Sequence, residues 1–304
     1  MHHRVSVIIP TRHRPALLAE VLASIAAQTV APTEVLVGDD STDDRTRQLI
    51  EADEARVRPF TLRYIHNQPP LGESGNVDAL YRAATGDLVL HLHDDDPLYP
   101  RCLELLLRPF QDHPDVVASF GLQYLLADDG TPLPDGAGHN RDFFRTPERA
   151  GLVDGRLAGA TGMFPNNGFL VRRDAAVRVG YGEGGRAGRA VDFSFGFRLG
   201  LLGLPMYFVH ELTTMVRLTT GSVSRSADAD NAYHTVRILL DHFADDHIGP
   251  EVATVLARNL PTAVRTALQK RERARAWRWT WSRWYRPRWT NPRWYRSVGS
   301  CLWP

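Results

Sequence analysis

The chain has 304 residues, of which 43% are hydrophobic and 23% are charged, and its formal net charge is +1. This composition is typical of a globular protein with a large core, and it excludes disordered and fibrous chains. The only cysteines, Cys102 and Cys301, exclude a disulfide framework and favour a reducing compartment. No run reaches the roughly 18 apolar residues of a membrane-spanning helix, and the run 5–9 is too short for a signal peptide, so we expect a cytoplasmic protein.

Strands and helices are predicted to alternate from the N-terminus. Short β-rich runs predict strands at residues 5–10, 34–38, 62–67 and 87–93, and helices are predicted between and after them at 15–28, 45–52, 72–84 and 100–111. In the first helix, for example, Leu18, Val21, Leu22 and Ile25 have helical spacing. This alternation with short loops predicts an α/β fold, a mostly parallel doubly wound sheet flanked by helices.

Polar residues follow each predicted strand, at the sheet edge where ligands collect in such folds. The loops carry Thr11 with Arg14, Asp39 with Asp40, Asn67, and the run from Asp94 to Asp96. Three adjacent carboxylates repel one another strongly when shielded from water, so the run requires a solvated turn, a helix N-terminus or a divalent cation. Because Asp39 and Asp40 are predicted at the same edge, the cation is favoured.

Beyond residue 115 the alternation becomes less regular. We expect a strand and hairpin at 116–133, followed by a loop-rich stretch at 134–161. Residues 166–185 are predicted to form a short strand, a helix and a glycine-rich loop. A helix at 190–203, a strand at 205–211 and a further segment at 216–224 follow. Two helical patterns, 231–243 and 250–275, close the globular part.

The last 35 residues differ from the rest in composition. From Lys270 onward there are ten Lys or Arg and one Glu, so this segment carries +9 and the remainder −8, and all seven tryptophans lie here. Arginine beside tryptophan favours a membrane interface, whereas the −8 remainder argues against nucleic-acid binding. Trp277, Trp281 and Trp284 have the spacing of one helical face, on a helix expected to reach about Arg286. We interpret the tail as a peripheral attachment to the inner face of the membrane; a tail packed on the preceding globular part is the alternative.

Six short motifs stand in a distinctive order: "VSVIIPT", "EVLVGDDSTD", "ATGDLVLHLHDDD", "NNGFLVRR", "VDFSFGFRLGLLG" and "VRLTTGSVS". In this order and spacing, over about residues 5–224, the sequence resembles the family 2 glycosyltransferases of the GT-A fold. The resemblance implies inverting transfer of a sugar from a UDP-, dTDP- or GDP-linked donor to an acceptor hydroxyl, with bound Mn²⁺ or Mg²⁺. A membrane-attached tail would suit a lipid-linked acceptor.

The resemblance also implies roles for individual residues. Nucleotide contacts are implied for Pro10, Thr11, Arg14, Asp39, Asp40, Asn67, Asn76 and Asp94. Asp95 and Asp96 would hold the metal ion, whose hard character suits carboxylate ligands, and Arg217 would contact the donor phosphates. Asp192, which opens a later predicted helix, would act as general base and take the proton of the acceptor hydroxyl.

Four positions depart from the family's pattern. His93 stands at the first Asp of the usual Asp-x-Asp, Val191 replaces a Glu before Asp192, Thr219 stands near a usual metal-binding His, and Gly75 replaces an Arg before Asn76. His91 and His93 flank Leu92 in the predicted strand, and we expect one of them to point to the core as a packed histidine rather than a ligand.

Other interpretations stay open from the sequence alone. Each candidate residue could instead have a purely structural role. Asp39 or Asp40 could cap a helix, and Asn67 and Asn76 could be turn or cap residues. Asp192 could be a charge at a helix N-terminus, and Arg217 a surface charge. A nucleotidyltransferase is the alternative enzyme, although no Gly-rich, Lys-bearing phosphate loop supports it. A non-catalytic nucleotide- or sugar-binding module is the third alternative, suggested by His93 and Thr219.

These patterns divide the chain into three parts. Residues 1–225 are predicted as the catalytic domain, with a nucleotide-binding half at 1–115 and an acceptor-binding half at 116–225. C-terminal helices are predicted at 226–275, and the basic, Trp-rich tail at 276–304.

Overall fold

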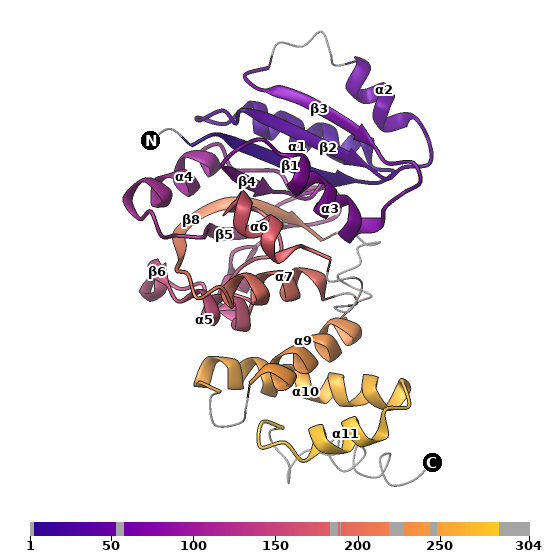
Figure 1. The fold of residues 1–304 in the computed structure, drawn as a ribbon, viewed down its shortest axis with the longest axis vertical. Helices are drawn as coiled ribbons and strands as arrows, with labels where there is room; N and C mark the ends of the chain where they lie inside the picture. The colour runs from indigo at the N-terminus through magenta and orange to yellow at the C-terminus, as the bar shows by residue number, and fades with distance from the viewer. Residues whose placement is uncertain are drawn as a thin grey trace. The chain divides into compact units, whose positions relative to one another are not determined.

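The computed structural model describes residues 3–52, 58–182, 188, 190–218, 228–243 and 248–285. The chain forms two compact units (Figure 1). One comprises Met1–Gly184 with Phe195–Thr219, and the other comprises Gly185–Ser194 with Thr220–Pro304. The predicted boundaries of the three parts stay a prediction.

The first unit is built on an eight-stranded sheet with the strand order β3-β2-β1-β4-β7-β5-β8-β6 (Figure 1). Its strands are β1 (Val5–Thr11), β2 (Glu34–Asp39), β3 (Thr61–His66), β4 (Leu88–His91), β5 (Ala118–Leu126), β6 (Gly151–Val153), β7 (Phe169–Arg172) and β8 (Met206–Arg217). The first four strands are parallel neighbours, and β8 is parallel to β5. Strand β7 is antiparallel to both β4 and β5, and β6 is antiparallel to β8. The predicted mostly parallel α/β sheet is therefore confirmed.

Helices lie on both faces of this sheet, with α3 and α6 on the near face in Figure 1 and α1 on the far face. The helices of the first unit are α1 (Pro15–Ala26), α2 (Arg45–Ala52), α3 (Gly72–Ala83), α4 (Cys102–Asp112), α5 (Gly155–Thr161) and α6 (Arg173–Val179), with 3₁₀ turns at Gly138–Phe143 and Pro147–Arg149. Helix α7 (Val191–Gly200) crosses from one unit to the other between Ser194 and Phe195.

The core explains why these segments fold as they do. Val7, Ile9, Val35 and Val37 are fully buried, and β1, β2 and β4 read as nearly continuous apolar runs because both sheet faces are covered. Helix α1 begins at Pro15, where a missing N–H costs little, and its buried residues have the predicted spacing. The loops at the carboxyl ends of β1, β2, β3 and β4 consequently share one edge of the sheet.

The structure differs from the sequence-based expectations in two places in the first unit. The stretch predicted as loop contains β6 and α5, because Asp154 caps α5 through the N–H groups of Arg156 and Leu157. Its glycine- and alanine-rich sequence hides the helical periodicity. The segment expected at 205–211 and the start of the one expected at 216–224 form a single strand, β8, which ends at Arg217. This strand is continuous because it pairs with β5 along its length, with a register shift near Leu122.

The second unit contains α9 (Asp228–His242), α10 (Pro250–Gln269) and α11 (Arg273–Thr280). The helix expected to run through to Arg275, and on to about Arg286, is broken after Gln269, because Arg271 adopts a left-handed backbone conformation with φ of 61°. Trp284 lies in the turn after α11, and the residues from Arg286 onward lie outside the described part. Within the described part of the chain, no helix combines the length and apolar character needed to cross a bilayer.

Candidate donor and metal site

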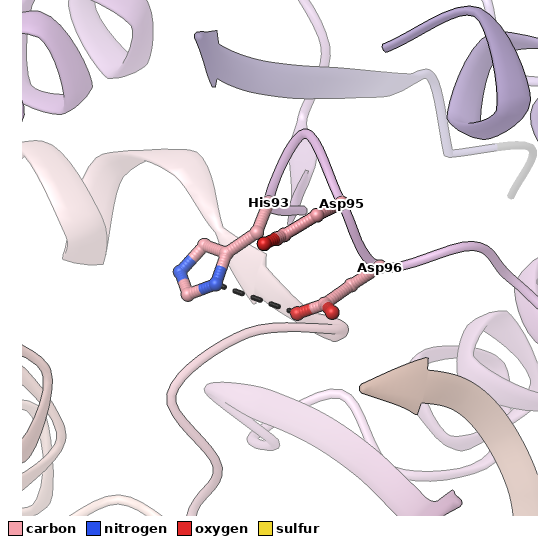
Figure 2. Close-up of side chains that lie close together, drawn as sticks. All are labelled: His93, Asp95 and Asp96. Carbon is pink, nitrogen blue, oxygen red and sulfur yellow. Dashed lines mark ion pairs between the residues drawn. The ribbon is translucent and has the colours of Figure 1, made fainter. Parts of the chain in front are cut away.

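The aspartate run stands in the turn that follows β4, together with His93 (Figure 2). One ligand atom each from His93, Asp95 and Asp96 lies within 4.8 Å of the others, and His93 Nδ1 lies 3.5 Å from Asp96 Oδ2. Asp95 is 8% exposed and Asp96 is 2% exposed. Two carboxylates and an imidazole therefore converge at the carboxyl end of a central strand.

Asp94 faces the loop after β1 and is held there by two side chains. Thr11 Oγ1 donates to Asp94 Oδ2 at 2.7 Å, and Arg14 Nη1 donates to Asp94 Oδ1 at 3.3 Å and to Asp95 Oδ2 at 3.0 Å. The expected meeting of the loops after β1 and β4 is therefore present. Arg14 supplies one positive charge against the three carboxylates.

The cluster holds more negative charge than its surroundings compensate. Burial, followed by the charge of Asp96 and then that of Asp94, raises the pKa of Asp95 to about 6, although His93 and Arg14 act in the opposite direction. Burial also raises the pKa of Asp94 against the hydrogen bond from Thr11 and the charge of Arg14. A divalent cation would relieve this repulsion, so the residues present fit a bound Mn²⁺ or Mg²⁺.

Asp96 is oriented from the other half of the sheet. Its Oδ1 accepts from the backbone N–H of Arg217 at 2.7 Å, and its Oδ2 accepts from Asn167 Nδ2 at 2.9 Å. Asn167 is fully buried, and its Oδ1 has no hydrogen-bond partner among the described residues. An unpaired buried acceptor beside the carboxylates is a second feature that fits a cation or its water.

The residues predicted to bind the nucleoside form a connected network after β2. Asp39 accepts from the N–H of Ser41 at 2.8 Å and from Tyr64 Oη at 2.7 Å, and Asp40 Oδ1 accepts from Asn67 Nδ2 at 2.8 Å. Asp39 and Asp40 are 0% and 3% exposed. The network fixes both carboxylates at the sheet edge, beside the loop after β1.

Asn76 closes this network from α3. Its Oδ1 accepts from Asn67 Nδ2 at 3.0 Å, and its Nδ2 donates to the carbonyl of Gly38 at 2.7 Å. A Cβ at Gly38 would lie 2.1 Å from Asn76 Oδ1, so glycine is required for this approach. Pro10 is half-buried at the end of β1, next to Thr11. Nucleotide binding by these residues stays a prediction.

Arg217 lies at the end of β8 and is anchored within the first unit. Its side chain is 5% exposed, its Nε donates to the carbonyl of Asp95 at 3.3 Å, and its Nη2 pairs with Glu20. Nη1 donates to the carbonyl of Asp128 at 3.2 Å. Arg217 therefore holds the aspartate turn in place, and its contact with donor phosphates stays a prediction.

Asp192 lies in the first turn of α7, as expected for the predicted base. It belongs to the second unit, while Phe195, in the next turn, belongs to the first unit and packs on Phe169 and Tyr181. Its role as general base stays a prediction.

The structure separates the roles of the two histidines and adds Asn167, to which sequence reasoning gave no role. His91 is the packed histidine that we expected, fully buried against Tyr81, and burial lowers its pKa. His93 joins the carboxylates, and its place in the Asp-x-Asp pattern was the signal for this. Asn167 stands in the motif "NNGFLVRR", but the motif gave it no role; the antiparallel entry of β7 beside β4 brings it to Asp96.

Comparison with known proteins gives the family. The model of glycosyl transferase family 2 matches residues 6–176, more than half of the chain. The chain belongs to glycosyl transferase family 2. The prediction of a glycosyltransferase is thereby confirmed at the level of the family.

Relatives and solved structures agree with this assignment. The chain is 33% identical over 109 residues to GalNAc(5)-diNAcBac-PP-undecaprenol beta-1,3-glucosyltransferase of Campylobacter jejuni, and this match covers 34% of each chain. The matched segments thus span about a third of the length of such curated relatives.

Solved structures match over nearly the whole chain. S. aureus TarS 1-349 in complex with UDP-GlcNAc has a TM-score of 0.59 at 16% identity and covers 98% of this chain and 80% of its own. Mannosyltransferase PcManGT of Pyrobaculum calidifontis, in complex with GDP-Man and Mn²⁺, has a TM-score of 0.63 at 19% identity and covers 100% and 88%. The predicted GT-A fold is confirmed.

Proposed function

We propose that this family 2 protein is a metal-dependent inverting glycosyltransferase that moves a sugar from a nucleotide-diphosphate sugar to an acceptor hydroxyl. The observation that supports it best is the convergence of His93, Asp95 and Asp96 after β4, beside the buried acidic network after β2. Solved neighbours of the same fold bind UDP-GlcNAc or GDP-Man, which supports a nucleotide-sugar donor.

The donor would lie along the edge formed by the loops after β1, β2 and β4. Asp39 and Asp40 would bind the base and ribose, with Thr11 and Arg14 beside them. Asp95 and Asp96 would hold Mn²⁺ or Mg²⁺, which neutralises the charge that develops on a diphosphate leaving group. Arg14 already contacts Asp95 and would add positive charge near the same group.

Asp192 would act as the general base. The acceptor oxygen bonds to the anomeric carbon while the bond from that carbon to the diphosphate oxygen breaks, and the hydroxyl proton passes to Asp192. Attack on the face opposite the leaving group inverts the anomeric configuration. The products are the glycosylated acceptor and a nucleoside diphosphate.

We propose a lipid-linked acceptor and a membrane-facing surface on α11. The Campylobacter relative is named for an acceptor that carries PP-undecaprenol. On α11 and the turn after it, Trp277 and Trp281 are 39% and 42% exposed with ring centroids 5.4 Å apart, and the exposed Arg278 lies between them in the sequence. Exposed indole rings beside cations favour the headgroup region of a bilayer.

Hydrolysis of a panel of UDP-, dTDP- and GDP-sugars tests the reaction. We expect Mn²⁺-dependent release of a nucleoside diphosphate from at least one donor, its loss in EDTA, and a large decrease in Asp95→Ala. Release of pyrophosphate or a nucleoside monophosphate would indicate attack at phosphorus and a nucleotidyltransferase instead. Full activity in chelator would exclude the metal-dependent mechanism.

A further inference from the structure

His93 differs in chemistry from the two carboxylates that it joins. Its Nδ1 faces Asp96 at 3.5 Å, and Figure 2 shows the imidazole and the two carboxylates on one side of the turn. His93 is half-buried, so the ring stays accessible at the edge of a site whose other members are buried. The cluster therefore offers one nitrogen and two carboxylate groups as ligands.

The position of His93 is fixed by its surroundings. The ring lies edge-on to His91, at a centroid distance of 5.7 Å, and His91 is itself enclosed by Tyr81, Phe169 and Tyr181. Asp96 is held by Asn167 and by the backbone of Arg217. A nitrogen ligand and a carboxylate are thus both held in place before a cation arrives.

A nitrogen ligand changes which cations such a site prefers. Mg²⁺ favours oxygen ligands in a strict octahedron and binds imidazole poorly, whereas Mn²⁺ and the later first-row metals accept imidazole. An imidazole in place of a carboxylate also removes one negative charge, and this loss weakens binding of the hard Mg²⁺ more than binding of metals that bond to nitrogen.

We infer that His93 is a direct ligand of the bound cation and makes this site select Mn²⁺ over Mg²⁺. The inference rests on the proposed metal-dependent function and adds to it the residue that sets the metal preference. His93→Asp restores an all-carboxylate set, so it should shift the site toward Mg²⁺.

Pulsed EPR of Mn²⁺ bound to the full chain with a nucleoside diphosphate is the direct test. The nucleotide is UDP, unless GDP or dTDP gives a larger thermal shift of the protein. Phosphorus coupling reports a cation on the diphosphate, which is the proposed function. Nitrogen coupling from an imidazole reports His93. We expect both in the wild type, and the nitrogen coupling alone should be lost in His93→Asp.

Competition between the two metals gives a second readout. Mg²⁺ is titrated into the Mn²⁺-loaded protein, and the solution EPR signal measures the Mn²⁺ that is released. We expect His93→Asp to lower the preference for Mn²⁺ over Mg²⁺ by about tenfold or more. His113→Asp is the matched control, since His113 stacks on Tyr207 at the end of α4 and should leave the ratio unchanged.

The outcomes separate the two claims. The role of His93 would be overturned if wild-type Mn²⁺ shows phosphorus coupling but no nitrogen coupling, and if the wild type and His93→Asp have the same preference between Mn²⁺ and Mg²⁺. That result would leave the proposed function standing. No Mn²⁺ binding with any nucleotide would overturn both. If His93→Asp does not fold, the nitrogen coupling of the wild type still decides the inference.

Discussion

A carboxylate at position 192 can accept a proton, whereas an amide of nearly the same shape cannot. We therefore expect Asp192→Asn to lower kcat by about 10²–10⁴-fold while the nucleotide affinity stays near that of the wild type. The control is Asp174→Asn, which removes an exposed carboxylate from the first turn of α6. Steady-state transfer and nucleotide titration measure the two quantities. A variant that keeps more than about a tenth of the rate would remove Asp192 from the role of base.

Asn167 acts at the same scale, through a single hydrogen bond to Asp96. Asn167→Leu removes this donor from a buried carboxylate, so we expect the Mn²⁺ affinity of the folded protein to fall by about tenfold. Asn166→Leu is the control, because the Asn166 side chain contacts Gln123 rather than Asp96. Calorimetric titration gives the affinity, and a thermal melt gives stability. A lower melting temperature with unchanged Mn²⁺ affinity would contradict a positioning role.

At the scale of elements, the strand pairing in the first half of the sheet could be predicted from sequence, whereas in the second half the strands β5, β7 and β8 were expected but their pairing was not. Strands β1 to β4 alternate with helices, and each pairs in parallel with a strand that the local pattern already defines. The loops carrying Thr11, Asp39 and Asp94 were therefore expected at one edge. Strand β7 enters antiparallel between β4 and β5, and it pairs with segments so distant in the sequence that no local periodicity encodes the pairing, as in Leu88 with Arg172 and Ala118 with Val171. Asn167 and its bond to Asp96 follow from that pairing.

One buried carboxylate ties the parallel strands together. Glu34, at the start of β2, accepts from Ser6 Oγ of β1 at 2.7 Å, from Arg63 Nη1 of β3 at 2.8 Å, and from the N–H of Thr85, before β4, at 2.7 Å. Burial by itself raises the pKa of this group, but the hydrogen bonds from Arg63, Ser6 and Thr85 outweigh it and lower the pKa to about 2.

This depressed pKa fixes the sign of a stability prediction. Because the pKa is lower in the folded state than the ordinary value of 4.5, Glu34 stabilises the fold above pH 4.5, and this contribution is lost as the pH falls toward 2. Glu34→Gln should lower the free energy of unfolding by roughly 2–3 kcal/mol at pH 7, with the difference shrinking below pH 4.5. Urea denaturation at several pH values measures it, with Glu51→Gln, at an exposed position of α2, as control. A difference that stays constant down to pH 2.5 would contradict this account.

At the scale of the whole molecule, charge and aromatic residues are divided unevenly along the chain, with +9 from Lys270 onward and −8 before it. In the second unit, Trp279 is 1% exposed and packs on Tyr233, whereas Trp277 and Trp281 are exposed. The alternative of a tail that only packs on protein therefore fits Trp279, whereas Trp277 and Trp281 present a substantial part of their rings to solvent. This difference allows the exposed pair to be changed without removing a core residue.

Trp277→Ser with Trp281→Ser should abolish most of the binding to vesicles that contain anionic lipid, because the indole rings supply the apolar contact and the arginines the attraction to the headgroups. Wild-type binding should weaken with salt and be lower on neutral vesicles, since exposed charges are screened. Leu152→Ser with Leu204→Ser is the matched control, because it removes two apolar side chains of similar exposure, 53% and 40%, from the first unit. Co-sedimentation with vesicles measures the bound fraction, and circular dichroism checks the fold. Equal partitioning of the tryptophan double variant and the wild type would exclude this surface as the membrane contact.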